Sequence, residues 1–167
     1  APNKVPKCSR THTTLSLSKK GIVTPWDRQI TLMEVYIMWI ENVAAIDITN
    51  GHHFDAGPNS MLISITDPAG WKPEAKHEFK ERHNFEFLDV EKNDFVLEEE
   101  MRCSESQAAD LVQLLQHALD NRMNVVVHCH MGVSRSGAVA EVGTMMGFRD
   151  TEKFRVPNLM VKKKSFF

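Results

Sequence analysis

The chain has 167 residues, of which 42% are hydrophobic and 25% are charged, and its formal net charge is −2. This composition is typical of a folded domain with its own core, and a near-neutral charge disfavours a nucleic-acid partner. We find neither an apolar run of membrane-spanning length nor a secretory leader, so we expect no membrane association. Three irregularly spaced cysteines, Cys8, Cys103 and Cys129, disfavour a disulfide framework and favour a reducing, cytoplasmic location.

The N-terminal residues differ in composition from the rest of the chain. Residues 1–20 are polar, basic and rich in serine and threonine, which predicts a loose arm in front of one folded domain over residues 21–167. The apolar residues 22–24 predict a short strand. Pro25 and Asp27 then favour the start of a helix over residues 27–40.

Further strands and helices alternate along the folded domain. Short apolar runs predict strands at residues 43–48, 61–65 and 85–88, and helical spacing predicts helices at residues 73–82 and 104–121. This alternation indicates an α/β fold. We expect a single domain with a central, mostly parallel sheet of about four to five strands, flanked by helices.

One segment near the middle of the C-terminal half combines a strand, a tight loop and a helix. Val125 to Val127 form a β-branched run typical of a buried strand, and residues 136–147 have the small side chains of a closely packed helix. The chain from Cys129 to Arg135 must therefore turn sharply between them. Its backbone N–H groups, together with the positive end of the helix, would form a cradle for a tetrahedral oxyanion.

The side chains at the two ends of this loop favour phosphate chemistry. A cysteine beside such a cradle loses its proton easily, and Arg135 can donate two parallel hydrogen bonds to a phosphate group. A zinc site is the alternative, because His128, Cys129 and His130 are all potential ligands. Consecutive loop residues seldom converge on one metal, however, and no second Cys or His pair completes a coordination shell. We therefore expect no metal here.

The pattern His128-Cys129, five residues, Arg135-Ser136 resembles the phosphate loop of the cysteine-dependent protein tyrosine phosphatases, particularly the dual-specificity branch. Weaker similarities at residues 63–68, 85–90 and 157–158 resemble small bacterial and phage-type members, and the resemblance extends over about residues 21–161. It implies that Cys129 attacks phosphorus, that Arg135 binds the phosphate and that Ser136 stabilises the departing thiolate. The rest of the implied phosphate loop is His130, Met131, Gly132, Val133 and Ser134.

The chemistry also needs a general acid for the leaving oxygen. In the family this is an aspartate at the end of a strand upstream of the loop, and Asp89 fits that pattern better than Asp94. An acidic residue usually stands where this chain has Leu88. Asp67 precedes a proline and is interpreted as a turn former. His128 is expected to orient the loop by hydrogen bonding.

The sequence thus predicts a phosphatase that hydrolyses phosphomonoesters on a protein or peptide through a phosphocysteine. Phosphotyrosine is the expected substrate, with phosphoserine and phosphothreonine left open. No metal or organic cofactor is required, and neither nucleic acid nor membrane is expected as a partner. The alternative is a pseudophosphatase that binds phosphoproteins without turnover, which a missing acid would favour. The loop has no lysine for extra lipid phosphates, which disfavours a phosphoinositide substrate.

Overall fold

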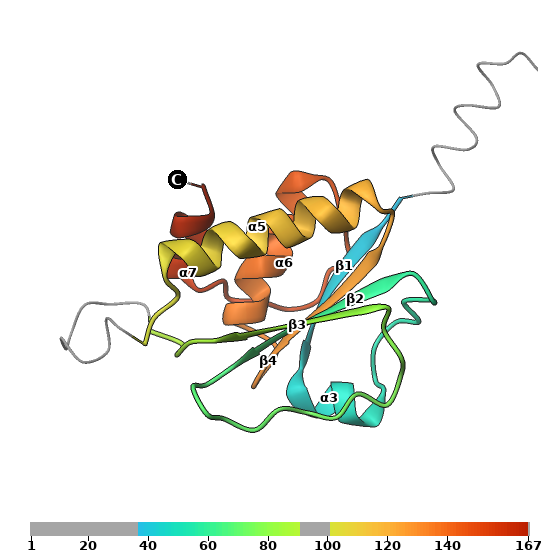
Figure 1. Cartoon of the computed structure of the whole chain (residues 1–167), viewed down its shortest axis with the longest axis horizontal. Coiled ribbons are helices and arrows are strands. Elements are labelled where there is room, and N and C mark those ends of the chain that lie inside the picture. The colour runs from blue at the N-terminus through green and yellow to red at the C-terminus, as the bar shows by residue number, and fades with distance from the viewer. Residues whose placement is uncertain (1–36, 91–100, 167) are drawn as a thin grey trace, which may run out of the picture. The chain divides into compact units, whose positions relative to one another are not determined.

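The computed structural model describes residues 37–90 and 101–166, and these residues form an α/β fold around a five-stranded parallel sheet (Figure 1). The strands, in the spatial order β3-β2-β4-β1-β5, are β1 (Trp39–Ala44), β2 (Ser60–Thr66), β3 (Glu81–Glu86), β4 (Asn124–Cys129) and β5 (Arg149–Asp150). The helices are α3 (Ala45–Asn50), α5 (Glu105–Asp120), α6 (Arg135–Met146) and α7 (Leu159–Phe166). The predicted parallel sheet flanked by helices is confirmed.

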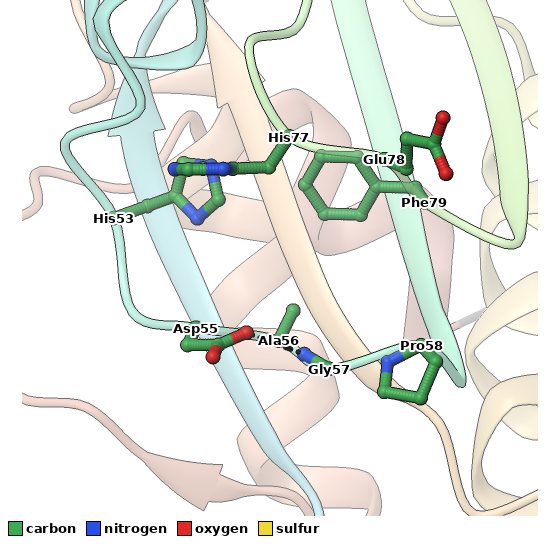
Figure 2. Close-up of a pocket in the computed structure, with 8 residues that line it drawn as sticks. All are labelled: His53, Asp55, Ala56, Gly57, Pro58, His77, Glu78 and Phe79. Atoms are coloured by element: carbon green, nitrogen blue, oxygen red, sulfur yellow. Dashed lines mark hydrogen bonds between the residues drawn. The ribbon is translucent and has the colours of Figure 1, made fainter.

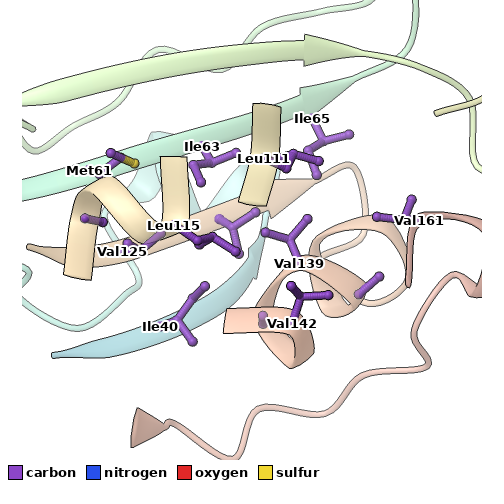
Figure 3. Packing of buried hydrophobic residues seen from close by; sticks show 14 of the residues in the cluster. Ile40, Met61, Ile63, Ile65, Leu111, Leu115, Val125, Val139, Val142 and Val161 are labelled. Atoms are coloured by element: carbon purple, nitrogen blue, oxygen red, sulfur yellow. The ribbon is translucent and has the colours of Figure 1, made fainter. Parts of the chain in front are cut away.

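Helices cover both faces of this sheet. Helices α5, α6 and α7 lie on one face and α3 on the other (Figure 1). On β4, Val125 packs into the larger core beneath α5 and α6 (Figure 3), and Val127 belongs to the same core. Val126 packs into a smaller core on the opposite face. A strand buried on both faces needs apolar side chains at every position, which explains its unbroken run of valines.

Helix α5 follows the sequence prediction closely. Ser104 and Gln107 form a reciprocal capping box, in which the Gln107 N–H donates to Ser104 Oγ at 3.0 Å and the Ser104 N–H donates to Gln107 Oε1 at 2.9 Å. Leu111 and Leu115 are buried on the face that packs against the sheet. The helix ends at Asp120, one residue before the predicted end.

Several predicted elements are wrong. The strand predicted at residues 43–48 is split, because β1 ends at Ala44 and α3 begins at Ala45, where Asp47 Oδ2 accepts the Ala44 N–H at 3.2 Å. The helix predicted at 73–82 does not form. That segment runs as a loop that buries Phe79 in the smaller core, and β3 starts at Glu81. The strand predicted at residues 85–88 therefore lies closer to the N-terminus, at Glu81–Glu86. The periodicity of such short runs does not distinguish a helix, a strand and a loop.

Other predictions fall wholly or partly outside the described residues. The arm at residues 1–20, the strand at 22–24 and most of the helix at 27–40 precede residue 37. The last part of that predicted helix is wrong, because Trp39 and Ile40 belong to β1 and pair with β5. In the part of the chain that the structure describes, no helix has the length and apolar character needed to cross a membrane.

Candidate active site

The loop that follows β4 lies at the carboxyl edge of the sheet, where ligands bind in open α/β sheets. Strand β4 ends at Cys129 and α6 begins at Arg135, so the residues between them form a strand-to-helix loop as predicted. We call residues 129–135 the phosphate loop. Its helix is anchored close to the sheet, because Gly143 packs its backbone against Ile40 of β1.

Neighbouring segments hold the phosphate loop by its carbonyl groups. The Asn42 side chain of β1 donates to the Gly132 carbonyl at 2.7 Å, and the Ala45 N–H donates to the His130 carbonyl at 3.2 Å. From the segment before α7, backbone N–H groups donate to the carbonyls of Val133 and Ser134. With these carbonyls bound to the surrounding structure, the loop directs N–H groups of Gly132 and Val133 toward the Cys129 sulfur.

Gly132 is required by the shape of this loop. Its φ is +74°, and a Cβ at this position would lie 2.3 Å from the Val43 carbonyl carbon and 2.4 Å from the Ala44 nitrogen. No larger residue fits without moving either β1 or the loop. The need for a glycine at position 132 follows from both the positive φ and this close approach.

Cys129 is buried, and its surroundings favour the thiolate. Burial alone would raise the pKa of Cys129, but hydrogen bonds from the Ser136 side chain and from backbone N–H groups lower it overall. The Ser136 hydroxyl lies 3.2 Å from the sulfur. Ser136 thus lies where it can stabilise a negative sulfur, as the resemblance implied.

Arg135 is held beneath the ends of β2 and β3. Its Nη1 donates to Asp67 Oδ1 at 2.6 Å and to the Phe87 carbonyl at 2.7 Å. Its buried Nε has no hydrogen-bond partner among the described residues. One side of the guanidinium is therefore fixed by the protein, while the Nε N–H is free to donate to a phosphate oxygen.

Asp67 makes a contact with Arg135 that the sequence did not predict. It does form the expected turn, since its carbonyl accepts the Gly70 N–H at 2.8 Å, but its carboxylate also pairs with Arg135. The one indication in the sequence was its position directly after β2. Carboxyl ends of neighbouring parallel strands meet at one edge, and β2 lies next to β4.

His128 points away from the nucleophile, into the other face of the sheet. It is fully buried, and its Nδ1 lies 3.4 Å from the Cys129 carbonyl oxygen. Burial, together with the nearby Arg135 charge, lowers the pKa of His128 to about 4, although the Cys129 carbonyl opposes this. The imidazole is therefore neutral at pH 7. Its position fits the predicted supporting role and excludes it as an acid or base toward the sulfur.

The remaining phosphate-loop side chains lie at the mouth of the site. His130 and Met131 are exposed, and 71% of the Met131 surface is accessible. The Ser134 hydroxyl donates to Asp89 Oδ1 at 2.8 Å. The loop thus presents a histidine and a flexible apolar side chain to any substrate that reaches Cys129.

Asp89, the predicted general acid, lies beside the phosphate loop. Besides Ser134, the side chain of Asn158 donates to its Oδ1 at 2.6 Å. Asn158 is buried, and its own Oδ1 accepts the N–H groups of Met160 and Val161 at the start of α7. Asn158 therefore joins Asp89 to α7 and, through its N–H, to the Ser134 carbonyl. The alternative acid, Asp94, lies outside the described residues.

A second described cysteine does not share these properties. Cys103 is buried in the larger core, and burial raises its pKa to about 11, although the charge of Lys164 opposes this shift. The thiol is protonated at neutral pH and is shielded from substrates. Cys129 is accordingly the better nucleophile of the two.

A separate cavity of about 420 Å³ lies on the α3 face of the sheet (Figure 2). His53 and His77 approach each other there with ring centroids 5.2 Å apart. None of the predicted catalytic residues lines this cavity, so it is distinct from the phosphate loop. Throughout residues 37–90 and 101–166, no group of three or more His, Cys, Asp or Glu side chains is arranged to hold a metal ion.

A cysteine with a lowered pKa, a cradle of backbone N–H groups and a fixed arginine on one strand-to-helix loop are the features expected of the cysteine-dependent protein tyrosine phosphatase superfamily. Residues 78–144, from the loop before β3 into α6, match the family model described as "Polymorphic toxin system, DSP-PTPase phosphatase". The segment with the phosphate loop is therefore similar to the dual-specificity-like phosphatases of this superfamily.

Nine solved protein chains are similar to this one. Among them is OH1 from the Orf virus, described as a tyrosine phosphatase with triple substrate specificity. It is 21% identical, with a TM-score of 0.43, and the match covers 66% of this chain. The chain spans only 57% of the length of OH1. No curated protein matches the sequence.

Proposed function

We propose that this chain hydrolyses phosphomonoesters on proteins, phosphotyrosine above all, through a phosphocysteine intermediate. The observation that carries the proposal is the environment of Cys129, whose pKa is lowered by the Ser136 side chain and by the N–H groups of its own loop despite burial. A structural cysteine in a core has a raised pKa, as Cys103 has. The family match at residues 78–144 supports phosphatase chemistry.

In the proposed first step, the Cys129 sulfur attacks phosphorus in line with the leaving oxygen. The S–P bond forms as the P–O bond to the substrate breaks. Loop N–H groups and the free Nε of Arg135 stabilise the equatorial oxygens, on which negative charge is concentrated. Asp89 donates its proton to the departing oxygen, because an alkoxide or phenoxide leaves poorly.

In the second step, a water molecule attacks the phosphorus of the phosphocysteine. Asp89, now a carboxylate, accepts a proton from this water, and the S–P bond breaks to release phosphate. The Ser136 hydroxyl, 3.2 Å from the sulfur, stabilises the thiolate that departs. The step restores both residues to their starting states.

The second candidate is a pseudophosphatase that captures phosphoproteins without turnover. Its supporting observation is the exposed position of Asp89, which the structure anchors through a single carboxylate oxygen. We favour the enzyme, because Cys129, Arg135 and Ser136 are all arranged for turnover. A cysteine thiolate survives in a reducing compartment, so we place the activity in a cytoplasm.

The experiment is hydrolysis of p-nitrophenyl phosphate from pH 5 to 8, with a chelator present, by the wild type, Cys129→Ser and Cys103→Ser. We expect turnover by the wild type and Cys103→Ser and none by Cys129→Ser. Phosphotyrosine and phosphoserine peptides would then establish the preference between phosphoresidues. Tight vanadate binding without turnover by the wild type would instead support the pseudophosphatase.

A further inference from the structure

A second pocket lies directly beside the phosphate loop, on the α3 face of the sheet. It has a volume of about 230 Å³ and shares two residues of its wall, His130 and Arg135, with the phosphate loop. Its other walls include His128 of β4, Thr66 and Asp67 at the end of β2, and Trp71 in the following loop. We call it the side pocket. A group bound there would be next to the phosphate that Arg135 binds.

Two residues in the wall of the side pocket each have a buried polar atom with no hydrogen-bond partner among the described residues. These are Nε2 of His128, a residue with no exposed surface, and Oγ1 of Thr66, a residue that is 6% exposed. An unpaired buried polar group is costly, and most such groups in folded proteins have a partner. Both atoms lie on one face of the sheet, since Ser64, two residues before Thr66, pairs with His128.

The chemistry of these atoms defines what they bind. Because the Cys129 carbonyl lies near Nδ1 of His128, that nitrogen carries the proton and Nε2 is a hydrogen-bond acceptor. The imidazole is neutral at pH 7, since burial lowers its pKa to about 4. The Thr66 hydroxyl donates or accepts. The two atoms together suit a hydroxyl or amide group that donates to His128.

Charged ligands fit the side pocket poorly. The Asp67 carboxylate and the Arg135 guanidinium both line the pocket, and they form an ion pair with each other at 2.6 Å. A second phosphate would meet the Asp67 carboxylate and the lone pair of His128, which both repel an anion. A cation would compete with Arg135 for Asp67. At the mouth, Trp71 is 58% exposed and offers an apolar surface for the rest of a substrate.

We propose that the side pocket binds the uncharged, hydrogen-bonding side chain of a residue adjacent to the phosphorylated residue in the substrate. Serine, threonine and asparagine side chains have the required chemistry, and the pocket volume accommodates one of them. The inference rests on the proposed protein phosphatase activity and adds a sequence preference to it. Thr66 and His128 are the residues that confer this preference.

The experiment compares phosphotyrosine peptides that differ at one neighbouring position, either directly before or directly after the phosphotyrosine. Threonine and valine form the matched pair, since they differ by a hydroxyl in place of a methyl group. We expect kcat/KM to be roughly 5- to 20-fold higher for the threonine peptide at one of the two positions, as one satisfied buried hydrogen bond provides. Equal kcat/KM values for the threonine and valine peptides at both positions would overturn the proposal.

The variant Thr66→Val tests the assignment of the pocket. It removes the hydroxyl at nearly constant volume, and we expect the threonine-to-valine ratio to fall toward one. The matched control is Thr49→Val, because Thr49 in α3 also has a buried, unpartnered hydroxyl but lies outside the side pocket. A ratio is independent of the fraction of active enzyme, so partial misfolding does not obscure it. An unchanged ratio in Thr66→Val would contradict the assignment.

Activity toward p-nitrophenyl phosphate distinguishes failure of the side-pocket proposal from failure of the proposed phosphatase function. This substrate has no neighbouring residue, so its hydrolysis depends on the phosphate loop and the acid but not on the side pocket. If the wild type hydrolyses it while the peptide ratio is one, only the side-pocket proposal fails. If the wild type hydrolyses neither it nor the peptides, the proposed phosphatase function fails.

Discussion

The pKa of Cys129 is lowered by hydrogen bonds from groups that lie close to it in the sequence. Ser136 and the loop N–H groups come from the same short segment, whereas Arg135 relies on Asp67 and Asp89 relies on Asn158. The proposed nucleophile is therefore positioned by its own loop, and the two groups proposed to assist it are positioned by other elements. This division leads to separate predictions for each residue.

The general acid is tested by leaving-group dependence. Asp89→Ala should slow turnover of an alkyl phosphate by about 10²- to 10⁴-fold, because an alkoxide needs the proton most, and should slow p-nitrophenyl phosphate far less. Steady-state kinetics with the two substrates provides the measurement. If Asp94→Ala shows this dependence and Asp89→Ala does not, the assignment of the acid is wrong.

Asn158→Ser should separate the positioning of Asp89 from the capping of α7. A serine hydroxyl still caps the helix, but it is too short to hold Asp89 Oδ1. We expect a roughly tenfold loss of kcat that is larger for poor leaving groups, with little change in stability. Equal losses for good and poor leaving groups would show that Asn158 acts only on the phosphate loop.

Asp67→Asn should weaken phosphate binding, because it removes the charge that holds Arg135 Nη1. Asp67 is more than half exposed, and solvent screening makes the effect modest, so we expect about a tenfold rise in the Kd for vanadate. Glu86→Gln, which removes an exposed ion pair with Lys72, is the matched control. Equal affinities in all three proteins would mean that Phe87 alone fixes the arginine.

The buried neutral His128 makes stability depend on pH. Its folded pKa of about 4 lies below the unfolded value of 6.5, so its contribution is complete above pH 6.5 and is lost as the pH falls toward 4. The loss amounts to about 3 kcal/mol. Urea unfolding at pH 7 and pH 4 should show a smaller loss for His128→Asn than for the wild type. If the free energy of unfolding fell equally in the two proteins between pH 7 and pH 4, His128 would be excluded as the source of the pH dependence.

At the scale of elements, the strand-to-helix connection depends on Gly132. Gly132→Ala should destabilise the protein by about 3 kcal/mol or more and abolish turnover, since the new Cβ would overlap β1. Gly57→Ala is the control, because Gly57 has φ +75° but no atom within 4 Å of the added Cβ. Its cost should be about 1–2 kcal/mol, with activity retained. Similar losses in urea unfolding for both variants would contradict the importance of the contact with β1.

The elements that the sequence predicted well are those with a local cause. Strand β4 was predicted from a buried valine run and helix α5 from the helical spacing of its apolar residues, and the loop chemistry follows from residues close together in the chain. The predictions of a strand at residues 43–48 and of a helix at residues 73–82 were wrong, because burial against distant strands outweighed local periodicity. Strand β5 and helix α7 were not predicted, since each is short.

The missed residues of the site depend on tertiary structure in the same way. Asp67 meets Arg135 across 68 positions, and Asn158 meets Asp89 across 69. Each is an ordinary turn or helix-cap residue in sequence terms. Only the parallel order of β2, β4 and β1 and the return of the chain into α7 place them around the phosphate loop.

At the scale of the whole molecule, the described fold brings every proposed functional group to one edge of the sheet. The proposed nucleophile is the last residue of the central strand β4, the carboxylate partner of Arg135 follows β2, and the proposed acid follows β3. The side pocket opens between β2, β4 and α3 at the same edge. The proposed catalysis and the proposed substrate selection would therefore both take place at one edge of the parallel sheet.

The most direct test is detection of the covalent intermediate. Rapid quenching of the wild type with excess phosphotyrosine peptide, followed by peptide mass spectrometry, should reveal one added phosphoryl group on the peptide that contains Cys129. Asp89→Ala should change how much of it accumulates, and Cys129→Ser should show none. Turnover without a phosphocysteine, or a phosphoryl group on another residue, would contradict the mechanism.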